Sequence, residues 1–160
     1  MKPIYVAVVV WAALAFFTGC QVRTDAEGKS SPEALSLALE MKDSVGKRVA
    51  DGFLYLPEDM QSGNTFAGKS QIRVLEMPEQ PSTERDHALR CLAQTNGKLS
   101  GRHKNGSIHI ELHPQTDDNS ITLEGQLWDQ TLKGKWCYQN YAGKRECGTF
   151  EAKRETKKRP

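Results

Sequence analysis

The stretch Ile121–Tyr138, ITLEGQLWDQTLKGKWCY, alternates apolar and polar residues on both sides of Asp129-Gln130. A period of two over such a run is typical of β-strands with one buried face, and the central dipeptide is typical of a tight turn. Pairing Leu123 with Trp136 places apolar residues opposite one another along the hairpin, whereas a slip of one residue would reverse the faces. The stretch therefore predicts an antiparallel hairpin with Trp136 on its inner face.

The same register extends to the strands on either side of this hairpin. Asn105-Gly106 is a strong hairpin signal, and the polar stretches 114–119 and 140–144 are typical of loops. Large inner residues then lie beside glycines, as in a strongly curved sheet. One such row contains Gly101, Ile110, Leu123, Trp136 and Gly148. We therefore predict a curved antiparallel meander of roughly five or six strands over residues 98–152.

The segment that follows residue 31 carries a helical pattern. Pro32 suits the first turn of a helix. Apolar residues then recur at helical spacing at Ala34, Ala38, Met41, Val45 and Val49. The pattern predicts a helix over residues 32–44 that extends toward residue 50.

Three further segments precede the meander. Phe53–Leu56 and Ser70–Met77 predict short strands, because each is rich in apolar residues and is followed by a proline. Residues 83–95 fit either a helix capped by Ser82 or a strand, and their composition favours the helix. The expected fold class is therefore α+β, with one or two N-terminal helices packed on the meander in a single small domain over residues 32–152.

The N-terminus has the layout of a signal peptide, in which Lys2 precedes an unbroken apolar run from Ile4 to Phe17. The run is too short to favour a lasting transmembrane helix. It ends in Phe17-Thr18-Gly19-Cys20, which resembles the lipobox of bacterial lipoproteins, with Phe in place of the usual Leu. The resemblance implies that residues 1–19 are removed as a signal peptide and that Cys20 is lipidated.

The resemblance also implies a location. Residues 20–31 would form a lipidated tether, and two or three acyl chains would hold it in a membrane permanently. Gln21 follows the cysteine, where an Asp would imply retention in the inner membrane, so the outer membrane is the expected address. The alternative is an ordinary secretory signal in which Cys20 occurs by chance.

Three cysteines remain if Cys20 carries lipid. The inferred register places Cys137 opposite Cys147 at the end of a hairpin, and an exported protein lies where disulfides persist. We therefore predict a Cys137–Cys147 disulfide and an unpaired Cys91.

The sequence offers little chemistry beyond these sites. With 22 Lys and Arg against 20 Asp and Glu, the chain lacks the charge excess of a nucleic-acid-binding protein. His109 and His113 lie on the outer face of one strand, too far apart to share a metal ion, although His109 with Glu124 could hold one weakly. His103 and Tyr138 are candidates for a pocket rim. We expect no cofactor, no metal ion and no catalytic residues.

These observations predict an envelope-anchored lipoprotein that serves as a non-catalytic binding or structural module on the periplasmic or outer surface. Its expected partners are the membrane, through the lipid anchor, and an envelope protein or the cell-wall polymer. The basic tail, residues 153–160, extends into solvent or contacts anionic headgroups or that polymer. Two alternatives remain: a small-ligand carrier, because avidin-like and lipocalin-like proteins have similar curved sheets, or a small envelope enzyme.

Overall fold

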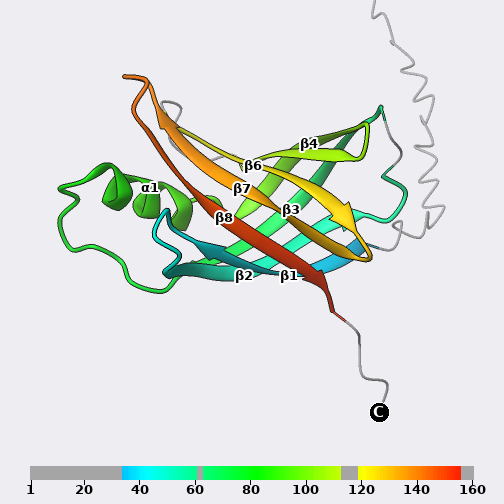
Figure 1. The fold of residues 1–160 in the computed structure, drawn as a ribbon, viewed down its shortest axis with the longest axis horizontal. Coiled ribbons are helices and arrows are strands. Elements are labelled where there is room, and N and C mark those ends of the chain that lie inside the picture. Colours follow the sequence, from blue (N-terminus) through cyan, green and yellow to red (C-terminus); the bar gives the residue numbers. More distant parts are fainter. Residues whose placement is uncertain (1–33, 61–62, 113–118, 156–160) are drawn as a thin grey trace, which may run out of the picture.

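The computed structural model describes residues 34–60, 63–112 and 119–155, which form a closed barrel of eight antiparallel strands (Figure 1). Each strand pairs with the next along the chain, and β8 closes the barrel by pairing with β1. Helix α1 (Glu84–Ala93) lies between β3 and β4. The strands are β1 (Ala34–Lys42), β2 (Arg48–Pro57), β3 (Thr65–Val74), β4 (Gly97–Lys104), β5 (Ser107–Leu112), β6 (Asn119–Trp128), β7 (Thr131–Asn140) and β8 (Arg145–Arg154).

The predicted α+β fold, an open meander covered by N-terminal helices, is wrong. The segment expected to be a helix over residues 32–44 forms strand β1. Its helix-forming composition is only a weak preference. As a strand it pairs with β2 on one side and β8 on the other, so it closes the barrel. Its inward side chains alternate along the strand and are at most 9% exposed: Leu35, Leu37, Leu39 and Met41.

The register predicted for the meander is confirmed. Leu123 lies opposite Trp136, and Trp136 lies opposite Gly148. The glycine is required here, because a Cβ on Gly148 would overlap the carbonyl oxygen of Lys42. The predicted meander corresponds to β4–β8, and β8 also includes Lys153 and Arg154, which the sequence had assigned to the basic tail.

Other predicted elements occur with shifted bounds. Phe53–Leu56 lies within the longer β2, and β3 ends at Val74 rather than at Met77. Of the two alternatives for residues 83–95, the helix is correct.

Inward side chains fill the interior of the barrel. An eight-stranded barrel is just wide enough for its side chains to fill it or to hold one small ligand. Here Trp136 is the largest side chain inside, and it is fully buried. Other large side chains that are fully buried include Leu37, Met41, Leu54, Leu56, Leu89, Leu92, Leu99, Ile108, Ile110, Leu112 and Ile121.

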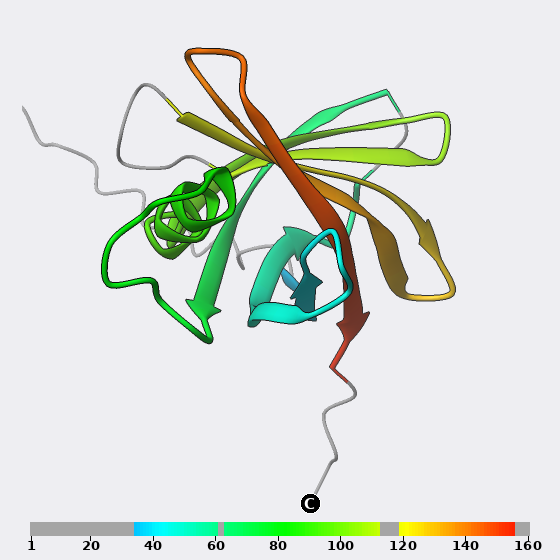
Figure 2. The ribbon, with the colours of Figure 1, turned by 60° about the vertical axis from the view of Figure 1, so that its left-hand side comes forward.

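Helix α1 packs against one end of the barrel (Figure 2). It begins at the N-cap Thr83, whose hydroxyl accepts the backbone N–H of Asp86, while the Asp86 carboxylate accepts the backbone N–H of Thr83. This capping box fixes the start of the helix one residue after the predicted Ser82. The buried face of α1 adds Ala88, Leu89, Cys91 and Leu92 to the core.

The two ends of the barrel differ. The helix end consists of α1 and the loops 43–47 and 141–144. The turn end consists of the two-residue turns Asn105-Gly106 and Asp129-Gln130 together with the start of β1 and the end of β8 (Figure 1). Backbone hydrogen bonds join these parts, because Arg154 donates to the carbonyl of Gln130 and Glu155 donates to that of Ser36, both at 3.1 Å.

Candidate functional site

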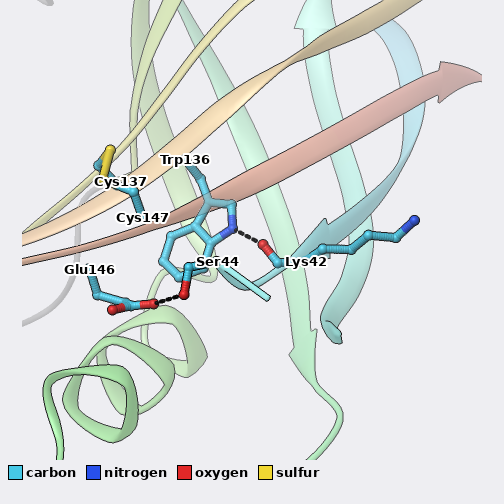
Figure 3. Close-up of a disulfide and its surroundings, with 6 residues drawn as sticks. All are labelled: Lys42, Ser44, Trp136, Cys137, Glu146 and Cys147. Carbon is cyan, nitrogen blue, oxygen red and sulfur yellow. Dashed lines mark hydrogen bonds between the residues drawn. A yellow bond between two sulfur atoms is a disulfide. The ribbon is translucent and has the colours of Figure 1, made fainter. Parts of the chain in front are cut away.

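A core tryptophan and a disulfide lie on adjacent residues of β7 near the helix end (Figure 3). The indole Nε1–H of Trp136 donates to the carbonyl oxygen of Lys42 at 2.7 Å, which ties β7 to the end of β1. The side chain of the next residue, Cys137, is joined to Cys147 by a disulfide across the β7–β8 pair, with a Cα–Cα distance of 4.1 Å. Both contacts hold strands together, so their role is structural.

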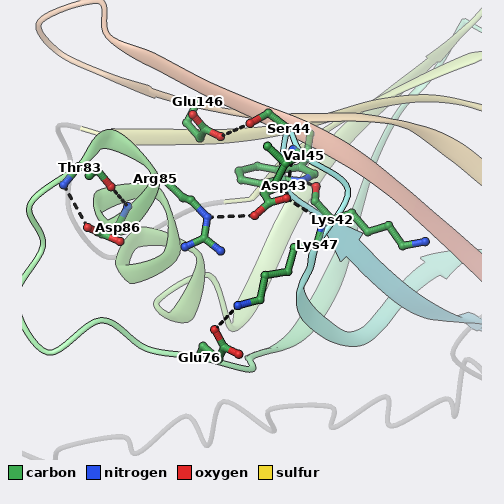
Figure 4. Close-up of polar contacts among 11 residues, drawn as sticks. Lys42, Asp43, Ser44, Val45, Lys47, Glu76, Thr83, Arg85, Asp86 and Glu146 are labelled. Atoms are coloured by element: carbon green, nitrogen blue, oxygen red, sulfur yellow. Dashed lines mark hydrogen bonds and ion pairs between the residues drawn. The ribbon is translucent and has the colours of Figure 1, made fainter.

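Asp43 is a buried carboxylate in the loop between β1 and β2, only 3% exposed (Figure 4). Its Oδ1 accepts the backbone N–H groups of Val45 at 3.2 Å and Lys47 at 2.8 Å, and its Oδ2 accepts Nε of Arg85 at 3.0 Å. Burial alone would raise the pKa of Asp43, but the hydrogen bonds from Lys47 and Arg85 and the Arg85 charge outweigh it, so the pKa is lowered. The ionised pair ties α1 to this loop.

A second ion pair ties α1 to the loop between β7 and β8. Glu84 accepts Nζ of Lys144 at 2.9 Å and Nδ2 of Asn140 at 3.2 Å. Together with the Asp43 contact, these bonds secure the helix on both sides. The carboxylates of Glu84 and Asp43 are therefore both engaged in contacts that hold the helix to the end of the barrel.

The two residues predicted to share a pocket rim lie far apart. His103, in β4, is half-buried at the turn end, where its Nδ1 lies 3.2 Å from the carbonyl oxygen of Met60. Tyr138, in β7, is 3% exposed near the helix end, and its hydroxyl donates to Oδ1 of Asn119 at 2.8 Å. Burial is the main cause of the raised pKa of Tyr138. The two side chains are bound to different parts of the fold and form no common site.

His109 lies between two acidic residues on the outer face of the barrel. Its Nδ1 is 3.2 Å from Glu124, as the register predicted, and its Nε2 is 3.5 Å from Glu111. Over residues 34–60, 63–112 and 119–155, no group of three or more His, Cys, Asp or Glu side chains is placed to hold a metal ion. His113 falls outside the described residues.

Two cysteines, Cys20 and Cys91, are not part of the disulfide. Cys91 is a free thiol on the buried face of α1, and burial raises its pKa to about 11. A thiol with so high a pKa is almost entirely protonated at neutral pH and is a poor nucleophile. Cys20, the predicted lipidation site, lies outside the described residues.

The most exposed large aromatic side chain at the turn end is that of Trp128, which is 83% exposed. It is the last residue of β6, and the next two residues, Asp129 and Gln130, both have positive φ, so they form the tight turn to β7. Leu127 turns inward, so Trp128 is displayed at the tip of the hairpin. Sequence reasoning missed this residue, although the register, with Ile121 and Leu123 inside, already assigned it to the outer face.

Charged residues surround Trp128 on the strands that meet at this end. Lys133 and Lys153 each lie 3.0 Å from the same oxygen of Glu151, and these two bonds hold the pKa of that carboxyl below its usual range. Arg154 forms an ion pair with Glu58 at 2.7 Å. The turn end therefore combines an exposed indole with basic side chains from β7 and β8.

Comparisons with known proteins add no further constraint. No family model matches the chain, and searches of curated proteins and of solved structures find no similar protein. Among the residues that the structure describes, no helix is long and apolar enough to cross a membrane. Function is therefore inferred from the chain's own residues.

Proposed function

We propose that this protein is an envelope-anchored lipoprotein that acts as a non-catalytic binding or structural module. One observation carries the binding part of the proposal: the barrel is filled by its own side chains, with Trp136, Leu54 and Ile110 all completely buried. A filled interior leaves the outer face and the two ends as the surfaces available to other molecules. The module therefore meets its partner, an envelope protein or the cell-wall polymer, from outside the barrel.

The lipobox-like sequence supports the anchoring part of the proposal. Cys20 is the residue that such a motif modifies, and a chain carrying two or three acyl groups stays attached to a bilayer. Gln21 in the following position favours the outer membrane as the address. The segment up to residue 33 would then link the lipid to β1.

Labelling with a radioactive fatty acid tests the anchor. The wild-type protein should incorporate the label and sediment with membranes, whereas Cys20→Ser should remain unlabelled. Cys91→Ser is the matched control, because it removes a cysteine that the fold buries, and it should be labelled like wild type. An exported wild-type protein without label would contradict the lipoprotein proposal.

A small-ligand carrier is the second candidate, because a closed eight-stranded barrel is also the architecture that can hold one apolar ligand. Titration with a fluorescent apolar probe, N-phenyl-1-naphthylamine, separates the two. The filled interior predicts no saturable binding by the wild-type protein. Saturable binding that Leu54→Trp abolishes would favour the carrier, since that substitution adds volume at a fully buried interior position.

A further inference from the structure

We propose that the turn end of the barrel lies against the surface of an anionic phospholipid bilayer and that Trp128 inserts into the membrane interface. The inference deepens the proposed function and rests on it, because the lipid on Cys20 is what brings the domain to the bilayer. It assigns an orientation: the turn end faces the lipid, and the helix end faces away from it.

The position of β1 in the barrel supports this orientation. β1 begins at the turn end, since its first residue, Ala34, pairs with Pro57 at the end of β2. Residues 21–33 separate Ala34 from the anchored cysteine, and a chain of that length reaches at most about 45 Å when fully extended. The helix end lies farther by the length of β1, about 30 Å along the strand. The anchored cysteine is therefore closer along the chain to the turn end than to the helix end, so we expect the turn end to lie next to the bilayer.

Trp128 has the chemistry of a membrane-interface residue. Tryptophan prefers the headgroup region, where its ring contacts apolar chains and its N–H stays hydrated. Trp128 is 83% exposed at the tip of a two-residue turn, so the ring can enter a bilayer without any change in the fold. The backbone bond between Arg154 and Gln130 fixes this turn to the end of β8.

Basic residues at the same end suit anionic headgroups. Lys133 and Lys153 share the single carboxylate of Glu151, which leaves one excess positive charge in this cluster. Arg102 and Lys104 flank the other hairpin turn, and the structure shows no ion pair for either within its described residues.

Acidic residues are also present at this end, and they make the charge balance depend on the sequence that follows β8. Asp59, Asp129 and Glu155 offset the remaining positive charge, so the described residues at this end carry no net charge. Beyond them, residues 157–159 read Lys-Lys-Arg and add three positive charges next to the end of β8. Basic segments beside a lipid anchor bind anionic membranes by electrostatic attraction. Anionic lipid should therefore strengthen the contact, with Trp128 supplying its apolar part.

Tryptophan fluorescence can test the orientation directly. A chain starting at Cys20 contains two tryptophans, Trp128 and Trp136, and only Trp128 is exposed. Since Cys91 is buried and the other two cysteines are paired, a maleimide-headgroup lipid can be coupled at Cys20. The coupled protein is placed on vesicles of phosphatidylglycerol and phosphatidylcholine whose acyl chains carry bromine, which quenches a nearby indole.

The emission assigned to Trp128, obtained by subtracting Trp128→Phe from wild type, should fall about twofold on brominated vesicles, because an interfacial depth of about 5–10 Å brings the ring close to the bromines. The matched control is Trp128→Phe/Tyr141→Trp, which moves the exposed indole to the helix end, where Tyr141 is 86% exposed. The indole at position 141 should not be quenched. Quenching at 141, or none at 128, overturns the proposed orientation.

Vesicles of phosphatidylcholine alone test the anionic component. The twofold quenching should weaken on them, and equal quenching on both compositions overturns the electrostatic part of the proposal. Because the chemical coupling replaces cellular lipidation, this experiment does not depend on whether the cell modifies Cys20. A failed fatty-acid labelling with successful quenching refutes the proposed anchor, while the reverse result refutes only the orientation.

Discussion

Replacing Trp136 should destabilise the barrel more than any comparable change at its surface. The side chain is fully buried, and its Nε1–H donates to the carbonyl of Lys42, so it fills the interior and ties β7 to β1 at the point where the barrel closes. Trp136→Ala should lower the free energy of unfolding by about 3–5 kcal/mol, through lost apolar contact and the cavity that remains. A domain of this size is stabilised by about 5–15 kcal/mol, so the loss is a large fraction of the total.

Two further variants separate the contributions. Trp136→Phe keeps most of the apolar contact but loses the hydrogen bond to Lys42, so it should cost about 1–2 kcal/mol. Trp128→Ala is the matched control, because it removes the same side chain where it is 83% exposed, and it should cost less than about 0.5 kcal/mol. The loss of unfolding free energy should therefore be largest for Trp136→Ala, smaller for Trp136→Phe and smallest for Trp128→Ala.

Urea denaturation followed by far-ultraviolet circular dichroism measures all three, because tryptophan fluorescence is altered by the substitutions themselves. The melting temperature of Trp136→Ala should fall by about 10–20 °C. If that variant unfolded within about 1 kcal/mol of wild type, or if Trp128→Ala lost as much, the assignment of Trp136 to the packed interior would be refuted.

Two other predictions concern Asp43 and the cysteines. Asp43→Asn should lower the free energy of unfolding by about 1–2 kcal/mol at neutral pH, since it removes the charge that Arg85 faces while keeping a hydrogen-bond acceptor. The pKa of Asp43 is lowered in the folded state, so its stabilisation is present above the ordinary value of 3.8 and is lost as the pH falls below it. The difference between wild type and variant in urea denaturation should therefore shrink on acidification, and a difference that grew would contradict this ion pair. Peptide mapping of the oxidised protein should recover Cys137 linked to Cys147, whose reduction should cost about 2–3 kcal/mol. Cys91 should react with a thiol reagent only after unfolding, because burial raises its pKa to about 11, and a crosslink to it or its rapid labelling in the folded protein would count against the structure.

The sequence alone determined most of the C-terminal half. Alternation in Ile121–Tyr138 and the turn at Asp129-Gln130 fix the hairpin, because both are local and a slip of one residue would bury polar side chains. The pairing of Cys137 with Cys147 follows from the same register, since one short hairpin joins them. Even the outward position of Trp128 was implicit in it.

The tertiary structure decided the rest. The segment that forms β1 satisfies a helical and an alternating pattern at once, and its residues alone do not choose between them. Pairing with β8 makes the choice, as in the contact of Met41 with Phe150, which no local pattern contains. The same holds for the bond between Asp43 and Arg85, which joins residues 42 positions apart in the sequence. Local preferences are worth a fraction of a kcal/mol per residue, about 0–0.7, whereas closing the barrel buries a whole strand and leaves no unpaired edge.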